Sequence, residues 1–100
     1  MQAKYSQVIG ISVTGRIGKW GDRAAREATN AARLLEVDAT FDASDVRIED
    51  AYYGVQYGVP TEAGNAAILE VAQSEAIILD PVYTGKAMSG LIDMARRKLI

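Results

Sequence analysis

A short run of polar and aromatic residues near the C-terminus has the side chains best suited to chemistry. The stretch "DPVYTGKAM" begins at Asp80 and places a phenol at Tyr83, a hydroxyl at Thr84 and an amine at Lys86. A second tyrosine, Tyr57, lies in the upstream stretch "YYGVQYGVP". Phenols and hydroxyls can each donate or accept a hydrogen bond, so these residues are candidates for a binding or proton-transfer site.

Spacing excludes one phosphate-binding motif and argues against a second, which stays open as the minor alternative. The Gly85-Lys86 pair resembles the end of a P-loop, but a P-loop needs Gly at position 80 and Ser or Thr at position 87, where Asp and Ala stand. The stretch "VTGRIGKWG" has glycines at positions 15, 18 and 21, whereas a dinucleotide fingerprint needs the spacing G-x-G-x-x-G. The spacing favours a turn whose glycines permit positive φ.

Composition narrows the function classes. The chain has 100 residues, a net charge of −2 and neither Cys nor His, which excludes thiolate chemistry, His-dependent triads and most transition-metal sites. It has no basic face, so we expect neither nucleic acid nor membrane as a partner. No apolar run reaches membrane-spanning length and no signal peptide is evident, so a cytoplasmic location is expected.

Short apolar runs predict strands. They are Val8 to Val13, Val46 to Ile48, and Ala76 to Leu79, the last of which looks the most buried. Asp80-Pro81 should end that strand, because Pro has no N–H to donate.

Helices are predicted between and after these strands. The first runs from Trp20 to Glu36, the second from Glu62 to Ser74 with Thr61 as its cap, and the last follows Lys86. The first helix should bury the stripe Ala24, Ala28, Ala31 and Leu35. The last helix should bury Met88, Leu91, Ile92 and Ala95.

This alternation predicts a single α/β domain over residues 1–100. We expect three layers, with a mostly parallel sheet of about three to four strands flanked by helices. Ligands in such sheets gather at the carboxyl ends of the strands. The loops expected there are Thr14 to Lys19, Ala51 to Pro60, and Asp80 to Lys86.

Two of these loops together resemble a known family. "YYGVQYGVPTEAG" followed by "LDPVYTGKAMSGLIDMARR" is similar to the pyridoxal-phosphate-dependent D-cysteine desulfhydrase and 1-aminocyclopropane-1-carboxylate (ACC) deaminase family. The resemblance is close from about Asp45 to Arg97 and looser before it. It implies part of the large domain of a tryptophan-synthase-β-like fold.

The resemblance also implies roles for three residues. Tyr57 and Tyr83 match two catalytic tyrosines on the substrate side of the cofactor. Thr84 matches the residue that faces the pyridine nitrogen of pyridoxal phosphate, and its neutral hydroxyl places the chain nearer the desulfhydrase branch than the deaminases. Without the motif, a Tyr beside Gly and Pro would more often be a packed loop anchor.

Other family features have no counterpart in this chain. The cofactor-bearing lysine and the Gly-rich phosphate loop of the family precede the matched segment, and none of Lys4, Lys19, Lys86 and Lys98 matches that lysine. Lys86 is expected to be exposed at a helix start. The spelling "GVQYG" around Tyr57 departs from the family's commoner "GPGYG". We therefore expect no covalent link between pyridoxal phosphate and this chain.

Two functions follow as hypotheses. The chain resembles a truncated domain of a pyridoxal-phosphate-dependent lyase that is catalytically incompetent alone, with a complementing chain supplying the missing lysine region. Alternatively, it is a stand-alone oligomeric α/β module for binding or structure. In either case we expect a homodimer, because a partial sheet leaves a strand edge and apolar helix surface uncovered.

Overall fold

The computed structural model describes residues 6–15, 18 and 20–100, which divide into two compact units. Among these residues, 6–10, 18 and 20–49 form the first unit, and 11–15 and 50–100 form the second. Within the described part of the chain, no helix combines the length and the apolar content that crossing a bilayer requires.

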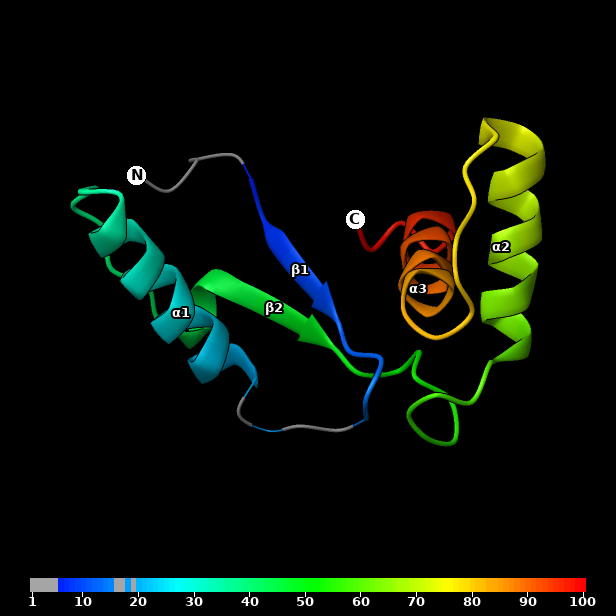
Figure 1. The fold of residues 1–100 in the computed structure, drawn as a ribbon, viewed down its shortest axis with the longest axis horizontal. Helices are drawn as coiled ribbons and strands as arrows, with labels where there is room; N and C mark the ends of the chain where they lie inside the picture. Colours follow the sequence, from blue (N-terminus) through cyan, green and yellow to red (C-terminus); the bar gives the residue numbers. More distant parts are fainter. Residues whose placement is uncertain (1–5, 16–17, 19) are drawn as a thin grey trace. The chain divides into compact units, whose positions relative to one another are not determined.

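The first unit is built around a small parallel sheet. Strand β1 (Val8–Ile11) pairs with β2 (Val46–Glu49), and helix α1 (Trp20–Leu34) packs against β2 (Figure 1). A short 3-10 turn, η1 (Ala43–Asp45), leads into β2. The predicted α/β class and parallel pairing are confirmed, and both strands lie where the apolar runs placed them.

The buried face of α1 differs from the predicted stripe. Ala25 and Ala32 are the buried residues of this helix, whereas Ala31 is exposed and Leu35 lies beyond the helix end, also exposed. The predicted stripe is therefore wrong, because the buried face of the helix is displaced from it by about one residue. The cause is the polar residue Thr29, whose hydroxyl accepts the Phe41 N–H at 2.9 Å and so faces inward at a position the apolar pattern did not mark.

The second unit is a pair of packed helices. Helix α2 (Glu62–Glu75) and helix α3 (Thr84–Arg96) lie side by side (Figure 1). Thr61 caps α2 as predicted, because its hydroxyl accepts the Gly64 N–H at 2.9 Å. The apolar core of this unit includes Ala67, Val71 and Met94.

Helix α3 buries a different face from the one its large apolar residues predicted. Leu91 is 46% exposed and Ala95 is exposed, while Met88 and Ile92 are half-buried. The buried positions are Gly85, Lys86, Ser89, Gly90 and Met94. Small residues set this face because they allow close packing: a Cβ atom at Gly85 would lie 2.9 Å from Ile68.

The predicted strand Ala76 to Leu79 is also wrong. Helix α2 ends at Ala76 in the left-handed conformation, with φ 57°, and the following residues run to Asp80 without strand pairing. This run was expected to be the most buried of the strands, yet Ile78 within it is 84% exposed. Among the described residues the sheet contains only β1 and β2, not three to four strands. An apolar run supplies strand propensity, but a strand also needs a neighbour for its N–H and C=O groups.

Candidate active site

The candidate site is organised by the Asp80 side chain, which caps the start of α3. Its Oδ2 accepts the N–H groups of Val82 at 2.8 Å and Tyr83 at 2.7 Å. Its Oδ1 accepts the Thr84 N–H at 2.9 Å and the Thr84 hydroxyl at 2.6 Å. These bonds all favour the ionised carboxylate, and they hold the pKa of Asp80 well below its usual range, with the Thr84 hydroxyl as the largest cause.

Thr84 is locked into this cap by both of its hydrogen-bonding functions. While its hydroxyl donates to Asp80, its Oγ1 accepts the Asp80 N–H at 2.8 Å. A hydroxyl has one hydrogen to donate and two lone pairs. Thr84 therefore has one lone pair left for a ligand, and it could donate to a ligand atom only by releasing Asp80.

Tyr83 and Tyr57 are brought together by the fold although 26 residues separate them. Their hydroxyls form a hydrogen bond, and their ring centroids are 5.9 Å apart with the planes tilted by 57°. The side chains are about half exposed, at 51% and 50%, so a ligand can reach both phenols. The hydrogen bond from Tyr57 is the main cause that raises the pKa of Tyr83, and the negative charge of Asp80 adds to it.

The loop that presents Tyr57 is a tight turn. The Val59 N–H donates to the Gln56 carbonyl at 3.4 Å, and Gly58 has φ 82°. A positive φ at the third residue of a turn is typical of type II turns and favours Gly. Tyr57 is the second residue of this turn, so the turn sets the direction of its side chain.

Lys86 was predicted to be exposed, and the structure shows the opposite. The residue is 0% exposed, and its ammonium group donates to the Gln56 carbonyl at 3.3 Å. The prediction was wrong because the amine reaches back under the 51–60 loop, which only the tertiary structure places there.

A further bond joins the same loop to the last turn of α3. The Tyr52 hydroxyl donates to Asp93 Oδ2 at 2.7 Å. This bond is the largest cause that lowers the pKa of Asp93, and Arg97, 3.3 Å away, acts in the same direction. The loop is thus attached to α3 near its beginning, at the tyrosine pair, and in its last turn, at Asp93.

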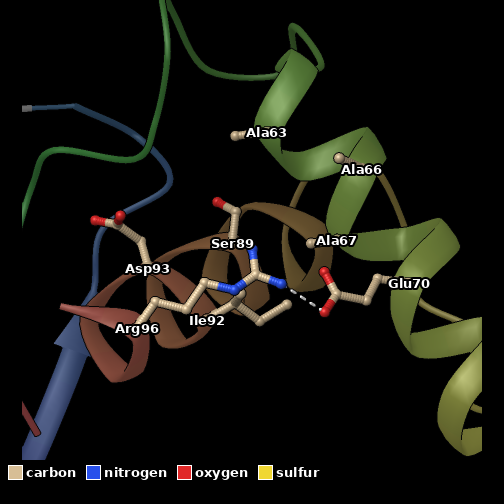
Figure 2. Close-up of a pocket in the computed structure, with 8 residues that line it drawn as sticks. All are labelled: Ala63, Ala66, Ala67, Glu70, Ser89, Ile92, Asp93 and Arg96. Carbon is tan, nitrogen blue, oxygen red and sulfur yellow. Dashed lines mark hydrogen bonds and ion pairs between the residues drawn. The ribbon is translucent and has the colours of Figure 1, made fainter. Parts of the chain in front are cut away.

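A separate groove lies between α2 and α3 (Figure 2). The α2 side is formed by three alanines and Glu70, and the α3 side includes Ile92 and Arg96. Figure 2 shows Arg96 reaching across to Glu70, with 2.8 Å between Nη2 and Oε1. None of the three predicted site residues lines this groove, so it is distinct from the tyrosine pair.

Sequence reasoning therefore named Tyr57, Tyr83 and Thr84, and the structure brings the two tyrosines together beside Thr84. Sequence reasoning missed the role of Asp80 as the capping side chain and the burial of Lys86. A signal for Asp80 was present, since an Asp side chain in a turn typically accepts the backbone N–H two residues further on, as Asp80 does from Val82. No sequence signal marked Lys86 as buried, because the loop that covers it is 30 residues upstream.

Comparison with known proteins agrees with the resemblance seen in the two loops. No family model matches the chain. Over 93 residues it is 39% identical to the D-cysteine desulfhydrase of Klebsiella pneumoniae (strain 342), a match that covers 93% of this chain and 27% of that enzyme. It is 37% identical to the 1-aminocyclopropane-1-carboxylate deaminase of Pseudomonas syringae pv. tomato, with 93% of this chain and 28% of that enzyme covered.

A solved structure gives the same answer for the fold. The crystal structure of an ACC deaminase homologue matches with a TM-score of 0.69 and 37% identity, covering 90% of this chain and 26% of that one. This chain is thus similar to one segment of the D-cysteine desulfhydrases and ACC deaminases. It spans about a quarter of the length of the curated relatives it matches. The family resemblance drawn from the "YYGVQYGVP" and "DPVYTGKAM" loops is thereby confirmed.

Proposed function

We propose that this chain supplies the tyrosine-bearing wall of a pyridoxal-phosphate-dependent active site of the D-cysteine desulfhydrase type, and that it is inactive by itself. The observation that carries the proposal is the hydrogen-bonded pair Tyr57 and Tyr83, half exposed beside the start of α3. Relatives that share this segment are named for D-cysteine desulfhydration and ACC deamination, and in both reactions an amino-acid substrate must be oriented and its protons moved.

The two phenols are suited to substrate binding and proton transfer. A raised pKa keeps the Tyr83 hydroxyl protonated at neutral pH, so the pair retains hydrogens that can be donated to a substrate carboxylate or to a developing negative charge. Because one phenol donates to the other, only one of the two hydroxyl hydrogens is committed within the pair. The other is available to a ligand.

The described residues could border one side of pyridoxal phosphate, but they do not provide the lysine and the phosphate site that would attach it. The bound cofactor would supply the electron sink for the reaction. Thr84 would border its ring nitrogen, and the spare lone pair on Oγ1 suits a protonated nitrogen without disturbing Asp80. Of the lysines in the described residues, Lys86 is buried and bonded to Gln56, and Lys98 lies beyond the far end of α3. We therefore propose that a complementing chain provides the lysine and the phosphate site.

Sulfide release from D-cysteine tests this proposal. The chain mixed with pyridoxal phosphate alone should release no sulfide above the free-cofactor background. The complement is the Klebsiella pneumoniae D-cysteine desulfhydrase from which the matching segment has been removed. Mixing the two chains should restore sulfide release, and Tyr83→Phe in this chain should abolish it, whereas the exposed change Leu69→Gln should not.

Either of two results would overturn the proposal. Activity of the chain alone, lost on Tyr83→Phe, would show that no complement is needed. Failure of the mixture to release sulfide, although the two chains are shown to associate, would show that the tyrosine pair does not serve this reaction.

A second function is favoured by the unpaired segment before α3. Residues 77–79 follow the C-cap of α2 and belong to no strand of the described residues, and Ile77 and Ile78 are 50% and 84% exposed. An unpaired apolar segment readily recruits a strand from another molecule. We propose that two copies of the chain pair through this segment to give a homodimeric binding or structural module. Light scattering at micromolar concentration should then give twice the 10.8 kDa chain mass, and a monomer throughout would contradict the module.

A further inference from the structure

Lys86 occupies a position that packing alone does not explain. It is 0% exposed, and the structure gives its ammonium group one hydrogen bond, to the Gln56 carbonyl. Among the residues that the structure describes, no salt bridge involves it. A buried ammonium loses its hydration and costs free energy unless it is well paired, so an apolar side chain of similar length would fill this space more favourably.

The single acceptor of Lys86 is the carbonyl that closes the Tyr57 turn. The Gln56 oxygen receives both the Val59 N–H and the Lys86 ammonium, at 3.4 and 3.3 Å. Both distances are long for hydrogen bonds between neutral groups, but a charged donor strengthens the second. Lys86 thus attaches the turn to α3 immediately before the residue whose phenol meets Tyr83.

Little else attaches this turn to the rest of the unit. Val55 is 82% exposed, and Gln56, Tyr57 and Gly58 are exposed as well. A Cβ atom at Gly58 would meet no other atom within 4 Å, so the turn is open on that side. Val59, the last residue of the turn, is half-buried, and the hydrogen bonds that the turn receives from the start of α3 are those of the Lys86 ammonium to its backbone and of the Tyr83 phenol to its side chain.

We propose that Lys86 is a positioning residue, which holds the Gln56–Val59 turn so that the Tyr57 phenol meets the Tyr83 phenol. Only the catalytic use of the tyrosine pair rests on the proposed function. The geometric part concerns the free chain and needs no cofactor.

The tyrosine pair supplies a readout that a merely structural lysine would not change. The pKa of Tyr83 is raised mainly by the Tyr57 hydrogen bond. Carbon NMR of the chain labelled at tyrosine Cζ follows each phenol as pH rises, and Tyr83→Phe assigns the Tyr83 signal. Tyr57→Phe removes the bond directly and gives the reference shift of the Tyr83 pKa toward its ordinary range.

We expect Lys86→Met to reproduce the lower Tyr83 pKa of Tyr57→Phe, and the double variant to show no further change. A remaining upward influence from Asp80 is common to all three variants. Lys98→Met, the same change at an exposed lysine, should leave the Tyr83 pKa as it is in the parent chain. Lys86→Arg, which keeps a charged donor, should retain most of the raised value.

Folding of each variant is checked by circular dichroism. Lys86→Gln serves if Lys86→Met does not fold, because its neutral amide is one atom too short to keep the Gln56 bond, and the same lower pKa is expected. A folded Lys86→Met or Lys86→Gln chain with an unchanged Tyr83 pKa overturns the inference but leaves the proposed function intact. Conversely, absence of sulfide release from the mixed chains would count against the proposed function and leave the Lys86 result standing.

Discussion

Helices α2 and α3 pack against each other, yet their first turns are stabilised very differently. At α2, the Thr61 hydroxyl accepts one backbone N–H, that of Gly64. At α3, the Asp80 carboxylate accepts the N–H groups of residues 82, 83 and 84 and the Thr84 hydroxyl, and the Asp80 carbonyl accepts the Gly85 N–H at 2.7 Å. A helix start leaves its first N–H groups without intrahelical partners. Asp80 satisfies two of these in α3, those of Thr84 and Gly85, and it also binds the two N–H groups that precede the helix.

The difference corresponds to what each helix carries. Helix α2 contributes an alanine-rich face to the packing and none of the candidate site residues. Tyr83, Thr84 and Lys86 all lie at the beginning of α3. A charged cap with several bonds restrains this segment, and restrained side chains are what a binding or catalytic site requires. The helix with the stronger cap, α3, is therefore the one that carries the candidate site.

The largest expected effect comes from Gly85→Ala, which tests how closely α3 is packed. A Cβ atom there would lie 2.6 Å from the Asp80 carbonyl oxygen, a backbone atom, and 2.9 Å from Ile68. We expect a loss of about 1–3 kcal/mol in the free energy of unfolding. Urea denaturation measures it. On α2, Gly64→Ala should cost less, because its nearest neighbour at 2.7 Å is the Thr61 hydroxyl, which can rotate away at the loss of the single cap bond to the Gly64 N–H. Equal losses would contradict the distinction.

Next in size is the removal of the caps. Thr61→Ala should lower the free energy of unfolding by about 1 kcal/mol. Asp80→Ala should lower the urea midpoint further than Thr61→Ala, because it leaves several donors unpaired rather than one. It should also lower the Tyr83 pKa, measured by tyrosine NMR, because the negative charge of Asp80 contributes to the raised value. A smaller effect at Asp80 than at Thr61 would show that α3 depends on packing alone.

A smaller effect is expected from pH, and its sign follows from the Asp80 pKa. The folded-state pKa lies below the unfolded value, so the stabilisation is fully present above the ordinary carboxyl pKa of about 4 and is lost as pH falls below it. Thermal unfolding between pH 7 and pH 2 should show this decline, and Asp80→Asn should flatten it. Asp93 contributes in the same direction. An acid limb that is unchanged in Asp80→Asn would exclude Asp80 as its source.

The smallest effect should come from the ion pair that joins the two helices. Arg96 and Glu70 are 2.8 Å apart, but their side chains are 68% and 47% exposed. Such pairs contribute about 0–1 kcal/mol, and salt weakens them. Glu70→Gln should therefore change the urea midpoint only slightly, and the change should vanish at high salt. A loss comparable to that of Gly85→Ala would mean that the Figure 2 groove, not the close packing, holds α2 and α3 together.

Local patterns predicted the helices and two of the strands well. The α/β class, the Thr61 cap and the bounds of α2 follow from short-range signals, because capping and helix propensity act within one or two turns. The phases of α1 and α3 could not be predicted this way. In both helices, the inward face is set by small or polar residues such as Thr29 and Gly90, and the apolar pattern marks only the large ones.

The candidate site likewise has one part that the sequence predicted and another that depends on the tertiary structure. The sequence by itself determined that Tyr57, Tyr83 and Thr84 match a family motif, because motif residues are read from neighbouring letters. Only the tertiary structure decided that the two phenols meet, that Asp80 engages the Thr84 hydroxyl, and that Lys86 is buried beneath the Tyr57 turn. It also left residues 76–79 unpaired despite their apolar character. The physical reason is that hydrogen bonding and burial depend on which distant segment lies opposite, and this is a property of the folded chain rather than of any short stretch of it.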